Sequence, residues 1–417
     1  MEWLLFNGVE VEELKQDYQL GSQTLARGSY VVWVAQARRG LADTALRIGV
    51  DVSPRINTLY APPAAWSHGY LSGADVVTIE DGTVFTPQTS RVKKPNRLRG
   101  GVEPGRATAY VLEIDSPTAV RALNGAVGEG VSAQLALESF PAPDGGTYPA
   151  GSVIFAGDPA TKAKLAAAGR ESGIVFRRLE DAMLPALDPI EGVPRIAVLA
   201  GGVNQDIWSL RELGFPADPV STSSGGALND PAGPNPLDDY DLVFNRGNWP
   251  GGETAQARLT AFFEAGGGYI GAEGNGAEFL EDSGQLPGLA ATEVSDEFGE
   301  SGIFNWENTG GPDSIIVGAY PGQDTLIMDP PTWFSAVPAG ASVDGRLLGD
   351  TTSMFAAGLW RLPRDASAES AAIVVHAPSS APGSSARITA FAMNPLYRAD
   401  PEREWPMVGT AAYWSDQ

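Results

Sequence analysis

The stretch of this sequence best suited to chemistry surrounds a glutamate, Glu273, within Gly266-Gly-Gly-Tyr-Ile-Gly-Ala-Glu-Gly-Asn-Gly-Ala-Glu-Phe-Leu280. Residues 269–272 are a short apolar run that predicts a buried strand, and residues 277–280 predict the first turn of a helix. A strand, one residue, a glycine-lined turn and a helix form the layout of a nucleophile elbow. Such an elbow would display Glu273 at the carboxyl edge of a sheet, where open α/β sheets bind ligands. Glu273 is therefore a candidate general base or ligand contact, and Asn275 in the same turn is a candidate ligand contact.

Several further elements would position this elbow. Strands are predicted at residues 195–200, 240–245 and 386–393, and helices at 205–213 and 254–265. The second helix has apolar residues at 259, 262 and 263, the spacing of one buried stripe. This alternation predicts a doubly wound, mostly parallel sheet over residues 194–417. We expect Glu273 to have an unusual backbone conformation at the strand-to-helix turn.

Residues 194–417 resemble a class I glutamine amidotransferase-like domain, which has a flavodoxin-like fold. In that family the elbow carries a catalytic cysteine in Gly-Ile-Cys-Gly-Gly, and a late strand ends in Phe-His-Pro-Glu. Here Gly271-Ala-Glu-Gly-Asn275 and Met393-Asn-Pro-Leu396 stand in those places. The resemblance thus puts Glu273 in place of the cysteine, Asn394 in place of the histidine and Leu396 in place of the acid.

This replacement removes the family's chemistry. A thiolate attacks carbonyls because it is nucleophilic and partly ionised near neutral pH, and a carboxylate without a base partner does not replace it. The chain contains no cysteine at all, so amidotransferase activity is excluded. Asn394 remains a candidate site residue only through its place in the motif.

The same resemblance places a second loop, Asn245-Arg246-Gly-Asn248-Trp249, where the family has its oxyanion loop. Arg246 would then lie next to Glu273. Two outcomes are open: a buried ion pair, or a polar ligand pocket that also uses Asn248 and Trp249. A glutamate at the helix N-terminus repels the phosphate that such a terminus otherwise attracts, so a nucleotide is not expected.

The N-terminal part of the chain contains two segments with the same predicted order of elements, residues 5–48 and 123–171. Each predicts a helix, a strand, a hairpin with a Gly-Ser turn, a strand and a helix, with Gly28 and Gly151 at the turns. A repeat above ~100 residues is too long for a solenoid and indicates duplicated α/β modules. A further hairpin is predicted around residues 76–85, where Glu80-Asp-Gly82 separates two apolar runs. The predicted domains are residues 1–108, 109–188 and 194–417.

Composition restricts the partners. The net charge is −23, which argues against nucleic acid because phosphates require a basic footprint. The most basic segment, residues 91–99, is either an exposed connector or a dock for an acidic neighbour. No run approaches the ~20 apolar residues of a membrane span. Residues 1–6 lack the pattern of a signal peptide and predict the end of a helix, so we expect an upstream domain on a longer or separate chain.

Residues 28–42, 60–75 and 395–405 resemble the region that follows the catalytic domain in large bacterial zinc carboxypeptidases of the M14 family. Some of those proteins also carry a degenerate amidotransferase-like domain. The resemblance implies an extracellular protein whose partner is an upstream peptidase domain or its peptide substrate.

The zinc site of that family is missing. A catalytic zinc needs about three protein ligands, and the family supplies them from His-x-x-Glu and a later histidine. The only histidines here, His68 and His376, are followed three residues later by Leu71 and Ser379. We therefore expect no metal and no cofactor. His68 is interpreted as a packed turn residue or, less simply, a ligand, and His376 as packing at a strand end.

Three hypotheses follow. The chain is a non-catalytic accessory region of an M14-type carboxypeptidase, a hydrolase that uses Glu273 as base with Arg246 as support, or a binding protein for a small polar ligand. A Glu273–Arg246 bond that fills the cleft would favour the first hypothesis. A raised Glu273 pKa in an open cleft would favour the second.

Overall fold

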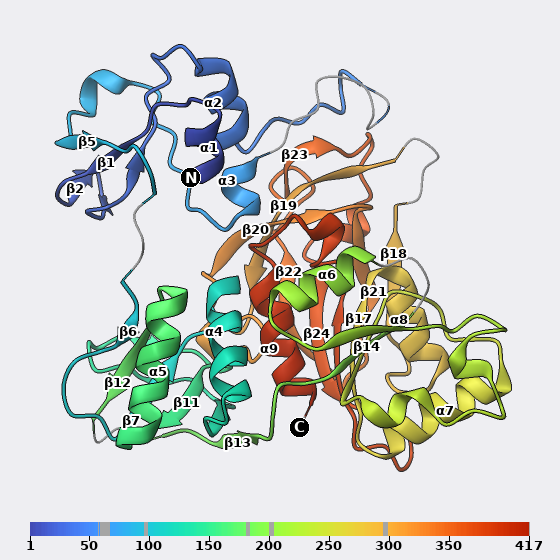
Figure 1. The fold of residues 1–417 in the computed structure, drawn as a ribbon. Coiled ribbons are helices and arrows are strands. Elements are labelled where there is room, and N and C mark those ends of the chain that lie inside the picture. Colours follow the sequence, from blue (N-terminus) through green and yellow to red (C-terminus); the bar gives the residue numbers. More distant parts are fainter. Residues whose placement is uncertain are drawn as a thin grey trace.

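The computed structural model describes residues 1–56, 58, 67–95, 99–180, 184–199, 204–294 and 299–416. Its strands form both parallel and antiparallel pairs, and helices pack on them, so the fold is mixed α/β. Figure 1 shows three parts: a first module (α1 to β5), a second module (β6 to β13) and a C-terminal domain (β14 to α9). Ala200, residues 60–66 of the second family resemblance and residues 96–98 of the basic segment lie outside the described residues.

The C-terminal domain has a parallel core of five strands in the order β15-β14-β16-β17-β25. Numbered along the chain this is the order 2-1-3-4-5, which flavodoxin-like doubly wound sheets share. Four of the strands are largely or fully buried apolar runs, as strands covered on both faces should be. The bounds are β14 (Ile196–Leu199), β15 (Ala217–Val220), β16 (Leu242–Asn245), β17 (Gly268–Ala272) and β25 (Arg387–Phe391).

The expectation of a mostly parallel sheet is wrong for the rest of this domain. The described residues form a 12-stranded sheet, and the strands between β17 and β25 pair antiparallel. The chain leaves the parallel core after α8, forms successive antiparallel pairings, and returns through β24, which pairs antiparallel with β25. These strands are β18 (Ala290–Glu293), β19 (Ser301–Asn308), β20 (Gln323–Met328), β21 (Thr332–Ala336), β22 (Ser342–Leu347), β23 (Phe355–Leu359) and β24 (Ala372–Pro378).

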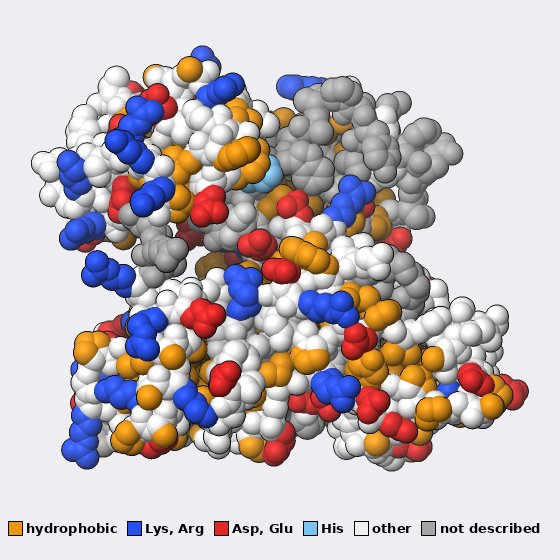
Figure 2. Space-filling model, viewed as in Figure 1, with side chains coloured by type: hydrophobic (Ala, Val, Ile, Leu, Met, Phe, Trp, Pro, Cys, Tyr) orange, Lys and Arg blue, Asp and Glu red, His pale blue; other side chains and the backbone are white. Residues whose placement is uncertain are grey.

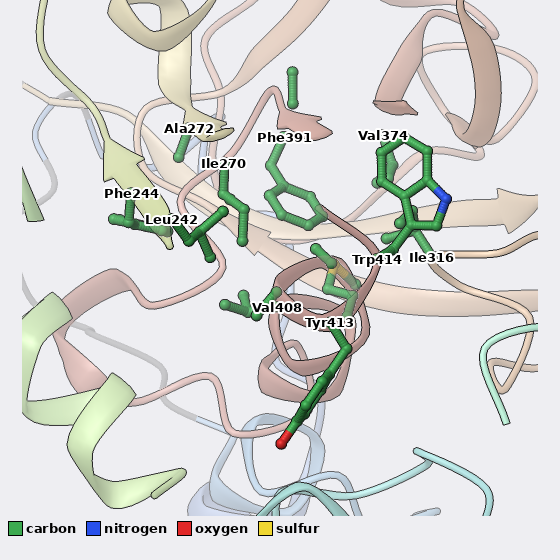
Figure 3. Close-up of a cluster of buried hydrophobic side chains, with 14 of the residues drawn as sticks. Leu242, Phe244, Ile270, Ala272, Ile316, Val374, Phe391, Val408, Tyr413 and Trp414 are labelled. Carbon is green, nitrogen blue, oxygen red and sulfur yellow. The ribbon is translucent and has the colours of Figure 1, made fainter. Parts of the chain in front are cut away.

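Helices cover both faces of the parallel core, because successive strand side chains point to opposite sides. On β17, Tyr269 stacks on Phe279 of α8 at a ring distance of 4.8 Å. The next residue, Ile270, lies on the α9 side with Val408 and Tyr413 (Figure 3). The helices of this domain are α6 (Asn204–Glu212), α7 (Glu253–Glu264), α8 (Glu273–Asp282) and α9 (Trp405–Ser415), with 3-10 turns η2 (Ala227–Asn229), η3 (Pro236–Asp239), η4 (Gly311–Asp313), η5 (Ala366–Ala368) and η6 (Tyr397–Ala399).

Helix α9 is buried along its whole length, which is expected of a helix that is hydrophobic all round. It lies between the sheet and the second module (Figure 1). The hydroxyl of Tyr413 hydrogen-bonds Asn124 of α4, and Asn124 donates to the carbonyl of Leu213 at 2.7 Å. The second module is therefore part of the covering of the C-terminal core.

The segments from α1 to α2 and from α4 to α5 share one order of elements, a helix, a strand, a two-stranded hairpin, a strand and a helix, and they share a strand pairing. Strands β1 and β4 pair antiparallel with β5 on the other side of β1, and β8, β11 and β13 repeat this arrangement. The first module contains α1 (Glu2–Phe6), β1 (Glu12–Leu14), β2 (Tyr18–Leu20), β3 (Gln23–Leu25), β4 (Tyr30–Val31), α2 (Arg39–Leu46), α3 (His68–Leu71), η1 (Gly82–Val84) and β5 (Thr89–Arg91). The second contains β6 (Gly101–Val102), β7 (Ala109–Leu112), α4 (Pro117–Gly128), β8 (Ala133–Ala136), β9 (Phe140–Pro141), β10 (Thr147–Tyr148), β11 (Val153–Ala156), α5 (Pro159–Ser172), β12 (Val175–Leu179) and β13 (Leu187–Ile190).

The Gly-Ser turns also correspond. Gly28 and Gly151 have φ of +91° and +81°, the left-handed region that glycine enters without a steric penalty. Gly28 donates its N–H to the carbonyl of Leu14, the last residue of β1, at 3.0 Å. Gly151 donates to Ala136, the last residue of β8, at 2.8 Å.

The hairpin predicted around residues 76–85 is wrong. Neither strand forms: residues 76–79 have no regular secondary structure, and residues 82–84 form the 3-10 turn η1. The Asp81 carboxylate accepts hydrogen bonds from the N–H of Thr83 at 2.9 Å and from its hydroxyl at 2.6 Å. Aspartate side chains that bond the backbone two residues ahead favour a local turn over strand pairing.

Both modules are joined to the C-terminal domain. Backbone hydrogen bonds link Val52 N–H to Gly358 O at 2.9 Å and Gly358 N–H to Val50 O at 3.1 Å. On the second module, Ala150 N–H bonds the carbonyl of Pro312 at 2.8 Å. Within the described part of the chain, no helix is both long and apolar enough to cross a membrane. Figure 2 shows acidic and basic side chains interspersed over the face in view.

Candidate functional site

Glu273 lies at the strand-to-helix turn that the sequence predicts, between β17 and the body of α8. Its φ is +63°, a conformation that costs a non-glycine residue of the order of 1–3 kcal/mol. The glycines nearby let the strand and the helix approach closely. A Cβ on Gly276 would lie 3.1 Å from the carbonyl carbon of Gly271 and 3.3 Å from the carbonyl oxygen of Asn245.

Arg246 connects Glu273 to a second carboxylate. Its Nη1 donates to Glu273 Oε1 at 2.7 Å, and its Nε donates to Asp206 Oδ2 at 2.8 Å. The Asp206 side chain is fully buried, while those of Arg246 and Glu273 are 20% and 16% exposed. Of the two outcomes left open by the sequence, an ion pair or a ligand pocket, the structure has the ion pair, and a third residue completes it.

One guanidinium therefore faces two carboxylates, which leaves an excess negative charge away from water. Burial raises the pKa of Glu273, and this outweighs the opposing effect of the Arg246 charge and hydrogen bond. Burial also raises the pKa of Asp206, again against the attraction of Arg246. The pKa of Arg246 is raised by its two acidic partners although burial lowers it. The carboxylates of Glu273 and Asp206 therefore hold a proton more readily than an ordinary carboxylate does.

Asn394 joins this group through Asp206 and makes no hydrogen bond with Glu273. It is buried, its Nδ2 donates to Asp206 Oδ1 at 3.4 Å, and its Oδ1 accepts the N–H of Leu396 at 2.9 Å. An amide in this place satisfies a buried carboxylate and a turn, and it has no proton to transfer near neutral pH.

The other candidate ligand contacts point to a different part of α8. Asn248 donates to Glu278 Oε2 at 2.7 Å, and the ring of Trp249 packs on Phe279 at 4.9 Å. Asn275 is exposed on the first turn of α8. Thus the structure brings Glu273, Arg246 and Asn394 into one cluster through Asp206, and it leaves Asn248, Trp249 and Asn275 outside that cluster.

Asp206 is the member that the sequence analysis missed. It lies in the first turn of α6, the helix after β14, and so at the carboxyl edge where β17 presents Glu273. An acid in the first turn of a helix is ordinary, since it complements the helix dipole. The available signal was its position at that sheet edge, opposite an arginine that follows the neighbouring strand β16.

Neither histidine takes part in this cluster. The ring of His68 packs against that of Trp3 in a tilted arrangement, at a ring distance of 4.7 Å. Nδ1 of His376 lies 2.5 Å from Asp344 Oδ2, so the side chain has a polar partner where we expected only strand-end packing. Among the residues that the structure describes, no group of three or more His, Cys, Asp or Glu side chains could hold a metal ion.

Some solved structures are similar to this one at low sequence identity. No family model matches the chain, and no curated protein matches it. A protein assigned as a GMP synthase subunit from Thermoplasma acidophilum is similar at 14% identity over 54% of this chain and 96% of its own, with a TM-score of 0.32. A ThuA-like protein from Parabacteroides merdae has 13% identity over 54% of this chain and 90% of its own, with a TM-score of 0.36. The glutaminase domain of Trypanosoma brucei CTPS, with bound acivicin, has 13% identity over 53% and 94%, with a TM-score of 0.30. These TM-scores are all below 0.5 and carry no function over to this chain.

Proposed function

We propose that this chain is a non-catalytic accessory region, of the kind that follows the peptidase domain in M14-type zinc carboxypeptidases. Its C-terminal domain is then a degenerate amidotransferase-like domain, and its partner is an upstream peptidase domain or a peptide substrate, outside the cell. The observation that carries the non-catalytic part is the contact of Arg246 with both Glu273 and Asp206.

The contact supports this proposal because it occupies the groups that chemistry would need. A nucleophilic elbow requires an exposed nucleophile and a base within hydrogen-bond reach. Here the elbow carboxylate is bound to an arginine, and the side chain in the place of the base is an amide bound to Asp206. The guanidinium, which could stabilise an oxyanion, already donates to two carboxylates. The cluster is built as an internal structural support for the turn between β17 and α8.

A second function has one observation in its favour. Burial raises the pKa of Glu273, and a carboxylate with a raised pKa is suited to general base work. In this alternative the chain is a hydrolase, or a binding protein for a small polar ligand, in which Glu273 and Arg246 exchange their mutual bond for contacts with the substrate.

One assay separates these functions. The purified chain is incubated with peptides that release a chromogenic C-terminal amino acid and with L-glutamine, in the presence and absence of zinc, beside Glu273→Gln and the exposed control Glu253→Gln. The accessory proposal expects no product above the no-protein blank from any of the three proteins. Product that Glu273→Gln loses and Glu253→Gln retains would establish the hydrolase instead.

A further inference from the structure

A second polar site lies away from the elbow, where the second module meets the C-terminal domain. It is a cavity of about 390 Å³, lined by η4, β22, β24, β25, the end of α9 and Leu137 after β8. This volume falls in the range of small-molecule sites, which occur preferentially at interfaces between domains. Five of its side chains carry the chemistry: Asp313, Ser342, His376, Arg387 and Trp414.

The imidazole of His376 is held in one orientation. Its Nδ1 lies 2.5 Å from Oδ2 of Asp344, and the other oxygen of that buried carboxylate accepts the hydroxyl of Ser314 at 2.5 Å. The Trp414 ring packs edge-on against the imidazole at 4.8 Å. A carboxylate that binds one ring nitrogen fixes the tautomer and leaves the other nitrogen, Nε2, for a further contact.

The remaining polar side chains surround this ring. Ser342 stands directly opposite His376 in the antiparallel pair of β22 and β24, and opposite residues present their side chains on the same face. Arg387 Nη1 donates to Asp188 Oδ2 at 2.8 Å, and the guanidinium lies 5.5 Å from the centre of the Trp414 ring. Asp313 accepts the hydroxyl of Ser139 through one oxygen at 2.5 Å.

Charge indicates the class of ligand. Each titratable group at the cavity already has an internal partner: Arg387 has Asp188, His376 has Asp344, and Asp313 has Ser139. Acidic and basic side chains stand side by side here, so a ligand with a net charge of either sign would meet a like charge as well as an opposite one. A neutral ligand adds hydrogen bonds without that repulsion.

Atoms for such bonds are available. Within the described part of the chain, His376 Nε2, Arg387 Nε and Nη2, the Ser342 hydroxyl and the second oxygen of Asp313 have no hydrogen-bond partner. They comprise both donors and acceptors, and a hydroxyl is a neutral group that both donates and accepts at a single atom. We propose that this cavity binds a small neutral sugar, whose hydroxyls bond these atoms.

The test uses the fact that the chain has only two histidines. With histidine labelled in the full chain, the imidazole NMR signals reduce to two sets, and His68→Gln assigns them. D-glucose, D-galactose, D-mannose and maltose are titrated separately, with sodium phosphate and glycine as ionic and zwitterionic probes at matched ionic strength. We expect at least one sugar to shift the His376 signal in a saturable way while the His68 signal stays in place.

Variants locate the site. Arg387→Lys should weaken the binding of that sugar by at least tenfold. The guanidinium has two free donor nitrogens, Nε and Nη2, in a fixed geometry that the ammonium of lysine cannot reproduce. Asp313→Asn keeps the hydrogen bond to Ser139 and should weaken the binding of the sugar less than Arg387→Lys does. The elbow variant Glu273→Gln should leave sugar binding unchanged, so this inference stands or falls separately from the proposed function. Absence of a saturable shift with all four sugars, or saturation by phosphate or glycine instead, would overturn it.

Discussion

The guanidinium of Arg246 lies between two carboxylates, and its charge offsets part of the free-energy cost of burying them. If Arg246 is replaced by methionine, Asp206 loses its ionic partner in a fully buried position and Glu273 loses its own. Removing one partner of a buried pair typically costs about 3–5 kcal/mol, because the remaining charge stays away from water. We expect a loss of this size in the unfolding free energy, measured by urea denaturation.

The matched control for that prediction is Arg211→Met on α6. Arg211 pairs with Asp218, and both side chains are more than half exposed, at 56% and 51%. Exposed pairs contribute about 0–1 kcal/mol, so this variant should lose no more than about 1 kcal/mol. Equal losses in the two variants would show that the elbow cluster is as open to water as a surface pair.

Asp416, at the end of α9, should make stability depend on pH. Burial, assisted by the charges of Asp241 and Glu191, raises its pKa to about 7 from an ordinary value of 3.8. Between these values the folded state binds more protons than the unfolded state, so stability falls as pH rises through the window from about 4 to about 7. Asp416→Asn should therefore leave the unfolding free energy nearly unchanged at pH 4 and raise it by about 4 kcal/mol at pH 8.

The exposed Asp238→Asn serves as the control for this pH series. It removes the same charge from the surface of η3. Its effect on the unfolding free energy should stay within the small contribution of a surface charge at both pH values. A stabilisation by Asp416→Asn that is the same at both pH values would contradict the assigned cause.

Part of the candidate site could be predicted from residues near one another in sequence. The elbow is such a case. One short stretch contains a buried strand, small residues and the beginning of a helix, and together these determine where Glu273 lies. Asp206 could not be found in this way. Its burial and its bond to Arg246 arise only when α6 and the loop after β16 meet at the sheet edge, and nothing local distinguishes it from a surface acid.

At the scale of elements, the contact between β17 and α9 depends on the absence of a side chain. A Cβ on Gly268 would lie 2.1 Å from the carbonyl oxygen of Ser415, which is a backbone atom that moves only with its helix. Gly268→Ala should therefore lower the unfolding free energy by about 2–3 kcal/mol. Gly125→Ala on the exposed side of α4 meets nothing within 4 Å, and it should raise stability by about 0.5–1 kcal/mol because glycine is a poor helix residue. A loss in both variants would place the cause in the loss of glycine itself rather than in the contact with α9.

The elements themselves were predictable where their pattern is local. Four of the five parallel strands of the core are buried apolar runs, and these four were predicted. Strand β15 was not, because its two central residues are an exposed aspartate and an exposed proline. Among the antiparallel strands, β24 was expected from the apolar run that ends at His376. Strands β18 to β23 were not predicted, because several have only a few alternating residues and their identity depends on partners far along the chain. The misassigned hairpin near residue 80 failed for the opposite reason, since a local Asp81–Thr83 turn overrides the apolar runs around it.

At the scale of the whole molecule, the two modules contain the same turn in different surroundings. The left-handed φ of Gly28 and Gly151 should cost an alanine about 1–2 kcal/mol at either position. A Cβ on Gly28 has only a distant neighbour, the Glu13 carboxylate at 3.8 Å. One on Gly151 would meet the carbonyl oxygen of Ile315 at 2.6 Å and the Thr410 methyl at 2.8 Å.

The second module should therefore be the more sensitive. We expect Gly151→Ala to lower the denaturation midpoint further than Gly28→Ala, by the equivalent of about 2 kcal/mol, since only Gly151 lies against the C-terminal domain. Near-ultraviolet circular dichroism of the folded variants would detect the accompanying change around the packed aromatic rings. Midpoints that agree within error would mean that the turn, and not the docking, sets the cost.

The position of β25 has a consequence for how this protein is made. This strand lies between β17 and β24 in the sheet, yet it follows both in the chain. As a nascent chain leaves the ribosome, β17 and β24 are complete while the strand that joins them is still being synthesised. Two open strand edges then face solvent or a chaperone, and α9, which covers the same core, emerges later still. Open edges of this kind recruit strands from other chains, so the yield of native protein should depend on chaperone supply and on dilution more strongly than its final stability suggests.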